Sequence, residues 1–498
     1  MDPSQIRPGS APPADPDTGP DPRRWKALAL LCAAYFMVIV DSQIVILALP
    51  EIESDLAFSP SGVQWVLSAY LLSFGGLLLF GGRTADVLGG RRMFMIGTAL
   101  FLGASVVCGL AWNSTILLVM RIVQGASAAI MAPTAMAVLM NTFDEGAERN
   151  RAIGIWTGIG AFGATAALLI GGPITDGLGW EWIFFINIPI AVPVLLLGPR
   201  LLRETPTSAA RTFDPLGAVT ITGAIALLVY AIVEAPEVGW GDGQTIALLV
   251  AAAALLGVFA LIEHRSAAPL VPLRIFRSVK LVGGNAMMLM VAMSLYGGAL
   301  ITSLYAQQVL GYSAIMFGLS TAIYSAMSMV GSNISGVVAT RVGFKPVAIV
   351  GTALLGSGAL LLSQISADGN YFGDLFWGLL IFGSGIGTTV VAASIAALSG
   401  ARPNEAGLAS GINNAVFQIG AALGIAICTS VATAHTAGPD RRTALTEGFQ
   451  AGFLAAAVMA GIGLVVALVL LAVRPARATA QEEAPSHPAQ PAPVSTST

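Results

Sequence analysis

The stretch "GRTADVLGGRRMFMIG", residues 82–97, decides the fold because a related stretch, "GVVATRVGFKPVAIVG", residues 336–351, occurs later in the chain. At a constant offset of 254, glycines align with glycines at three positions and Arg91 aligns with Lys345. Both stretches follow a long apolar run, so we expect both to be short loops between membrane helices. Weak internal repeats of this kind occur in membrane proteins built from duplicated halves. The repeat therefore predicts two related helical bundles.

The composition places the chain in a membrane. Only 10% of its 498 residues are charged and 55% are hydrophobic, whereas soluble domains carry about 25% charged residues. A membrane helix needs about 20 apolar residues, and only internally bonded backbone is stable in lipid. We therefore predict an all-α integral membrane protein with 14 spans; fusing or discarding the pair within 214–263 would leave twelve. The approximate spans are 26–50, 62–82, 93–112, 114–140, 151–174, 181–199, 214–235, 243–263, 281–310, 313–337, 344–365, 372–398, 407–433 and 448–473.

The basic residues predict the orientation, because Lys and Arg gather in cytoplasmic loops. If the N-terminus is cytoplasmic, the inner segments hold 21 of the 24 basic residues and the outer loops hold only Arg441 and Arg442. Arg121 lies within a span and completes the count. We therefore expect a multi-pass plasma-membrane protein with both termini in the cytoplasm.

The spans divide the chain into two bundles of six helices with an inserted pair between them. The net charge of −3 gives no indication of a nucleic-acid partner. The three cysteines lie in predicted spans, and no metal-binding spacing, P-loop or dinucleotide motif is present, so we expect no cofactor and no enzyme. The predicted divisions are a disordered tail 1–25, a first bundle 26–200, an inserted pair 201–265, a second bundle with its leading loop 266–474, and a disordered tail 475–498.

Two charged residues lie deep within predicted spans. Asp41 is in the outer half of the first span, in "VIVDSQIVILALP" (38–50), and Arg121 is at a similar depth in the fourth. Each costs about 2.5–3.5 kcal/mol at the centre of a membrane helix. The two side chains could form a pair or share a water-filled cavity. One interpretation is an acid that binds and releases a proton while Arg121 adjusts its affinity; the alternative is a permanent ion pair that fixes helix packing.

The repeated loop has a second predicted role. Its glycines permit a tight turn and close helix approach, and its aspartate could bond a neighbouring helix N-terminus or an arginine. We predict a conformational latch, against the alternative of a simple cytoplasmic anchor. The latch residues are Gly82, Asp86, Gly89, Arg91 and Arg92.

Polar and aromatic side chains within the spans are candidates for a substrate cavity. Methionines in the ninth and tenth spans also suit promiscuous binding, although each such residue could equally serve only in packing. The cavity candidates are Tyr35, Gln43, Trp65, Gln124, Trp156, Tyr305, Asn413 and Gln418.

Several motifs together resemble one family. "VDSQIVILALPEI", "GRTADVLGGRR", "RIVQGASAAI" and "GLASGINNAVFQIGAALG" are similar to motifs of the major facilitator superfamily, as is "GWEWIFFINIPI". The chain resembles in particular the fourteen-helix drug:proton antiporters of actinobacteria, over residues 26–474. The resemblance implies the major facilitator fold and a proton site formed by Asp41 and Arg121.

The chain also departs from the family pattern. The antiporter motif of the fifth span usually begins Gly-Pro, but here Ala167 and Leu168 stand in that place, while Gly171 and Gly172 of the motif are kept. Gln43 and Ile46 stand where the first-span motif usually has Thr and Asn, and Val87 and Gly90 stand where the loop motif often has arginine. The loss of Gly-Pro weakens the indication of antiport.

The resemblance implies export of hydrophobic or amphipathic drugs in exchange for protons, by alternating access in a monomer. The expected partners are small substrates, protons and the lipid bilayer, with the proton gradient rather than a cofactor as energy source. Lipid export and export of one dedicated secondary metabolite are alternatives within the same fold. A channel or a non-transporting scaffold is the alternative from a different class.

Overall fold

The computed structural model describes residues 23–59, 62–143, 147–204, 215–266, 269, 271, 273–401, 405–436 and 440–472. Every regular element in these ranges is a helix, which confirms the predicted all-α class. Thirteen of the described helical segments are long and apolar enough to cross a membrane. The predicted span 151–174 is helical too, within α5, but is not one of the thirteen, so the count of fourteen stays a prediction. Both predicted tails lie almost wholly outside the described residues.

The first group of helices surrounds α1 and α4. The asparagine before α4 caps it, since the Asn113 side chain accepts a hydrogen bond of 2.9 Å from the Ile116 amide. α4 packs on α2 and α3, and α1 packs on α5. The group consists of α1 (Arg24–Asp55), α2 (Trp65–Leu88), α3 (Gly90–Gly109), α4 (Ser114–Thr142), α5 (Ala147–Leu178), α6 (Trp182–Phe185) and α7 (Ile188–Leu201).

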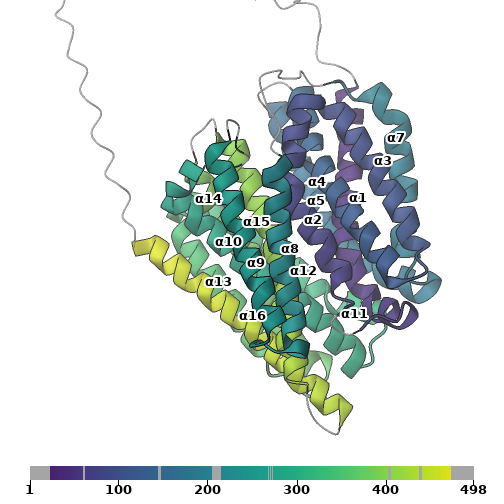
Figure 1. Cartoon of the computed structure of the whole chain (residues 1–498), viewed down its shortest axis with the longest axis vertical. Coiled ribbons are helices and arrows are strands. Elements are labelled where there is room, and N and C mark those ends of the chain that lie inside the picture. The colour runs from purple at the N-terminus through teal and green to yellow at the C-terminus, as the bar shows by residue number, and fades with distance from the viewer. Residues whose placement is uncertain are drawn as a thin grey trace, which may run out of the picture.

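The second group is built around α10, α14 and α15, with α16 running along its edge (Figure 1). Short 3-10 and π segments, η2 to η4, join or extend these helices. The group consists of η2 (Leu273–Arg277), α10 (Val279–Leu304), η3 (Tyr305–Val309), α11 (Ala314–Ser320), α12 (Ala322–Val342), α13 (Phe344–Leu362), η4 (Tyr371–Leu375), α14 (Phe376–Ser399), α15 (Ala406–Ala434) and α16 (Arg441–Ala472).

The remaining pair, α8 (Pro215–Val238) and α9 (Gly243–Arg265), packs together and separates the two groups in the chain. α8 contacts both α2 and α15, so it lies against both groups (Figure 1). The Ser430 hydroxyl of α15 donates to the Ile232 carbonyl of α8 at 2.8 Å. This arrangement agrees with the expected inserted pair, while the exact domain boundaries stay a prediction.

The sequence repeat reappears in the backbone. Gly89 precedes α3 with φ +94°, and Gly343, its partner at the offset of 254, precedes α13 with φ +82°. L-residues with a side chain rarely adopt this region, so glycine is required at both turns. The two halves therefore share a turn geometry as well as a sequence pattern.

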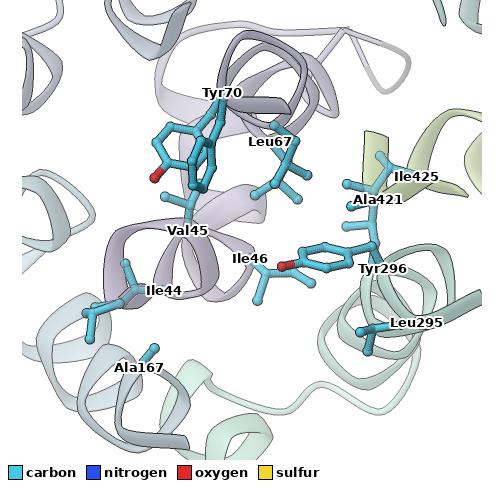
Figure 2. Packing of buried hydrophobic residues seen from close by; sticks show 14 of the residues in the cluster. Ile44, Val45, Ile46, Leu67, Tyr70, Ala167, Leu295, Tyr296, Ala421 and Ile425 are labelled. Carbon is cyan, nitrogen blue, oxygen red and sulfur yellow. The ribbon is translucent and has the colours of Figure 1, made fainter. Parts of the chain in front are cut away.

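The two groups meet around α1. Figure 2 shows three consecutive α1 side chains pointing in different directions: Ile44 toward Ala167 of α5, Val45 toward Tyr70 of α2, and Ile46 toward Tyr296 of α10. Eighteen of the 32 residues of α1 are buried. Any movement of one group against the other must therefore involve the packing of this helix.

Candidate functional site

Asp41 is completely buried among helices of the first group. Its Oδ2 accepts a hydrogen bond of 2.7 Å from Arg121 Nη1, so the predicted pair is formed, with both side chains at 0% exposure. Its Oδ1 accepts from Gln124 Nε2 at 3.2 Å and from Asn187 Nδ2 at 2.9 Å. Three donors therefore satisfy the oxygens of this buried carboxylate, and each replaces a bond to water that burial removes.

Arg121 is held from several sides. Its Nε donates to the Val66 carbonyl at 2.8 Å, and its Nη1 also donates to Gln124 Oε1 at 2.9 Å. Arg121 and Gln124 are three residues apart on α4, which places both on one face of the helix. The guanidinium carbon lies 4.3 Å from the centre of the Tyr70 ring, a cation–π geometry. The ion pair is therefore fixed in position by α1, α2 and α4 together.

Ser105 of α3 connects the two amides that bond Asp41. Its Oγ accepts from Gln124 Nε2 at 2.8 Å and from Asn187 Nδ2 at 3.1 Å. The Cys108 thiol, one turn further along α3, donates to Gln124 Oε1 at 3.4 Å. Among the residues that the structure describes, the network leaves two of its buried polar atoms without a hydrogen bond, Arg121 Nη2 and Asn187 Oδ1. Each could take one further partner if the pair separates.

Asn187, Ser105 and Cys108 were not candidates from the sequence. Asn187 lies between α6 and α7, and the only signal for it was a polar amide inside the apolar motif "WIFFINIPI". Ser105 and Cys108 are small residues in a span, which gives no signal at all. Only the folded chain shows that these three residues belong to the network around Asp41.

In the predicted latch, Arg91 bonds Glu204, a residue that was not a candidate from the sequence. Arg91 is not simply facing the cytoplasm: its Nε donates to Glu204 Oε2 at 3.2 Å, and Glu204 Oε1 accepts from the Arg91 amide at 3.1 Å. Glu204 therefore caps the N-terminus of α3, where a negative charge is favourable. A Cβ on Gly89 would lie 2.5 Å from Glu204 Oε1. The Arg92 amide donates to the same Glu204 Oε1 at 3.5 Å, whereas Gly82 lies against Pro133 of α4. The Asp86 side chain lies outside the described residues, so the latch stays a prediction.

The eight cavity candidates do not gather around one cavity. Gln124 belongs to the Asp41 network, and Tyr35 stacks on Trp156 with ring centres 4.2 Å apart, inside the first group. Tyr305 donates to the Ser366 carbonyl at 2.8 Å. Trp65 packs near Tyr230 of α8, and Asn413 bonds Asn285 inside the second group. The last two candidates, Gln418 and Gln43, lie where the two groups meet.

Gln43 lies at the centre of the interface between the groups. Its Nε2 donates to the Tyr296 hydroxyl of α10 at 3.0 Å, and it lines a cavity of about 40 Å³ together with Tyr324 and Phe382. Pockets for drug-sized ligands span about 300–1,000 Å³. The cavity therefore holds little more than water in this conformation.

A larger cavity of about 480 Å³ opens between the groups at the far end of α1 from Arg24. Its lining includes Glu53 and Arg441, together with Gln64 and Thr429, whose side chains bond each other. None of these four residues was a candidate from the sequence, because polar residues at span ends are expected in any membrane protein.

Two contacts hold the halves together beside α5. Asp176 Oδ1 accepts from the Ala314 amide at 3.1 Å and its Oδ2 from the Ile315 amide at 3.0 Å, so an α5 carboxylate caps α11 of the other group. Gly172, kept from the antiporter motif, lies so close that an added Cβ would be 2.6 Å from the Ile315 Cα. Gly171 lies against Ile44 of α1 in the same way. Gly171 and Gly172, the two glycines kept from the antiporter motif, thus allow α5 to pack tightly against α1 and α11.

Two related helical groups joined at one interface, with a fully buried ion pair inside one of them, are typical of polytopic membrane transporters. The chain belongs to the Major Facilitator Superfamily, whose family model matches residues 31–425 and 287–497. Membership of this transporter family confirms the predicted family and the expectation of a transporter rather than an enzyme.

Similar proteins agree with this assignment. The chain is 36% identical over 488 residues to a puromycin resistance protein of Streptomyces alboniger, covering 95% of this chain and 96% of that protein. It is 35% identical to a tetracenomycin C resistance and export protein of Streptomyces glaucescens, covering 83% and 76%. In fold it matches a bacterial homologue of the human lysosomal transporter Spinster in an inward-facing, unoccupied conformation, with a TM-score of 0.64, 18% identity, and coverage of 91% and 97%.

Proposed function

We propose that the chain exports hydrophobic or amphipathic drugs across the plasma membrane in exchange for protons, as a monomer with both termini in the cytoplasm. Asp41 binds the proton, and Arg121 adjusts its affinity. Membership of the superfamily and the antibiotic resistance and export named for two relatives support export of small molecules. The placement of 21 of 24 basic residues in the predicted inner segments supports the orientation.

The observation that carries proton coupling is the isolation of Asp41. Its carboxylate is fully buried, and its partners are one cation and two neutral amides. Protonation of Asp41 would leave Arg121 as an unpaired buried cation, which is strongly unfavourable. A rearrangement that gives Arg121 another acceptor or water relieves that cost. Binding of a proton is thus linked to a change in helix packing.

α1 connects the proton site to the interface between the two groups. Asp41 and Gln43 are two residues apart, so their side chains point about 200° apart around the helix. Asp41 faces α4 within the first group, whereas Gln43 bonds Tyr296 of the second group. A shift of α1 on protonation therefore disturbs the interface that closes the central cavity. Protonation of Asp41 can thus drive alternating access, in which the two groups rock against each other.

The test is a proton-transport assay in proteoliposomes that carry a pH-sensitive dye. Asp41→Asn keeps the size of the side chain but cannot bind a proton, so we expect drug-dependent proton movement to be lost while the protein still inserts and folds. Asp55→Asn is the matched control, since Asp55 is an exposed carboxylate on the same helix, and it should retain transport. Full drug export coupled to protons in Asp41→Asn would remove Asp41 from the mechanism.

A dedicated exporter of one secondary metabolite is the second candidate. It is favoured by the two relatives, each of which is named for a single antibiotic. A panel of cationic dyes, neutral drugs and antibiotics in the same assay separates the candidates. Proton movement with many members supports multidrug export, and movement with one supports the dedicated exporter.

A further inference from the structure

The second group of helices carries an apolar groove on its outer face. α12 and α13 both pack closely on α14 but make few contacts with each other beyond the turn that joins them. The space between them, about 390 Å³, is lined by valines and isoleucine of α12 and by valines, proline and leucine of α13. Ser384 and Thr388 of α14 also line it.

The groove is lined by exposed apolar side chains. Ile334 is 58% exposed and Val350 is 56% exposed, on opposite walls. An apolar groove between two helices long enough to cross a membrane fits an alkyl chain, which gains dispersion contacts with α12, α13 and α14.

One end of the groove is basic. α12 ends at Val342 and α13 begins at Phe344, so the turn at Gly343 closes this end, and Val342 and Pro346 both line the groove there. Arg341 is exposed directly before the turn, and Lys345 follows it. Arg341 and Lys345 thus flank the turn at this end of the groove.

We propose that this groove binds an anionic phospholipid, with one acyl chain between α12 and α13 and the phosphate near Arg341 and Lys345. Basic pockets between membrane helices recognise anionic headgroups in this way. A neutral or zwitterionic lipid would fill the groove equally well but gain less from the charges. In the orientation proposed above, the site faces the inner leaflet.

A second groove on the same group provides an internal comparison. It measures about 490 Å³, lies between α10, α15 and α16, and is equally apolar, with Met293, Leu454 and Val458 in its walls. Among the described residues its lining includes His435 but no lysine or arginine. It should therefore hold lipid without selecting an anionic headgroup.

The test is native mass spectrometry of the purified full chain in a mixture of phosphatidylglycerol and phosphatidylethanolamine. The wild type should retain phosphatidylglycerol preferentially. Arg341→Gln should lower that preference about fivefold, the effect expected for one basic residue near an anionic headgroup, and Arg341→Lys should largely restore it. Loss of the preference in Arg341→Lys as well, or no loss in Arg341→Gln, would overturn the role of the charge.

A second pair of variants locates the acyl chain. Val350→Trp fills the basic groove, and Val458→Trp fills the comparison groove from a residue that is also 56% exposed. We expect Val350→Trp to remove the selectively retained phosphatidylglycerol and Val458→Trp to leave it. The reverse result, or a loss of drug transport in Val350→Trp with lipid retention unchanged, would assign the groove to something other than an anionic lipid.

Discussion

At the scale of single residues, the pairing of Asp41 with Arg121 has unequal consequences for stability and for function. A buried pair contributes little net stability, because desolvation offsets the attraction, but removal of one partner leaves a buried charge and costs about 3–5 kcal/mol. Both side chains are fully buried here, at an N–O distance of 2.7 Å. The contribution of the pair to stability is therefore best measured by comparing variants in which one residue is neutral with a variant in which both are neutral.

We expect Arg121→Gln to lower the thermal stability of the protein markedly, and Asp41→Asn with Arg121→Gln to recover much of the loss. The double variant has no charge left in the pair, so the desolvation cost disappears. The measurement can use the chain's own thiols: Cys32, Cys108 and Cys428 are all buried, and a thiol-reactive dye reports unfolding as they become exposed. A double variant no more stable than Arg121→Gln would show that the pair does not act as a unit.

The pair itself could be predicted, but its surroundings could not. Asp41 and Arg121 are recognisable because charge is rare in a span and because the two fall at the same depth. Asn187 could not be placed, since it lies in the break between α6 and α7, and only the folded chain shows that its amide donates to Asp41. Glu204 was missed for a similar reason: nothing in a loop glutamate indicates that it caps a helix 113 residues earlier.

At the scale of helices, α5 forms the junction that closes the interface on its side. Asp176 caps α11, and Gly172 allows the α11 backbone to approach closely. The motif that includes Gly172 lacks its usual Gly-Pro, and Ala167 instead packs toward Ile44 of α1 (Figure 2). The close approach therefore depends on Gly172 alone, which makes this glycine the more sensitive position.

Gly172→Leu should force α5 away from α11 and open the interface. Ser303→Cys reports this opening, because Ser303 is fully buried on α10, where its hydroxyl donates to the Ile46 carbonyl at 3.0 Å. We expect an impermeant thiol reagent to label Ser303→Cys about tenfold faster in Gly172→Leu, an effect of the order expected for the loss of one charge-assisted bond. Gly177→Leu is the control, since nothing lies within 4 Å of that position. Equal labelling in both backgrounds would contradict a gate at this junction.

At the scale of the whole molecule, apolar length and the internal repeat predicted most of the architecture. The all-helical class, the membrane location and the two related halves follow from apolar length and from the repeat at an offset of 254, which returns as the turns at Gly89 and Gly343. The positions of the eight cavity candidates relative to one another could not be predicted, because the candidates were chosen by residue type. Which face of a helix meets the other group depends on packing between segments hundreds of residues apart.

The number of spans is the remaining global prediction, and α5 decides it. Thirteen described helical segments satisfy length and hydropathy, and α5, with 32 residues, does not count among them. At about 1.5 Å per residue it is nevertheless about 48 Å long, more than the roughly 30 Å of a bilayer core. It also packs along α1, which is itself a candidate span, and reaches α11 and α12. We therefore expect α5 to cross the membrane as the fourteenth span.

An even number of spans puts both termini on one side of the membrane, and an odd number puts them on opposite sides. The test adds single cysteines to the two tails and labels intact cells with an impermeant thiol reagent, before and after permeabilisation. The three native cysteines are buried and give little background. We expect both tails to react only after permeabilisation, because 21 of 24 basic residues then lie on the cytoplasmic side. Labelling of one tail in intact cells would mean that α5 does not cross the membrane. Each loop after α5 would then lie on the side of the membrane opposite to the one predicted.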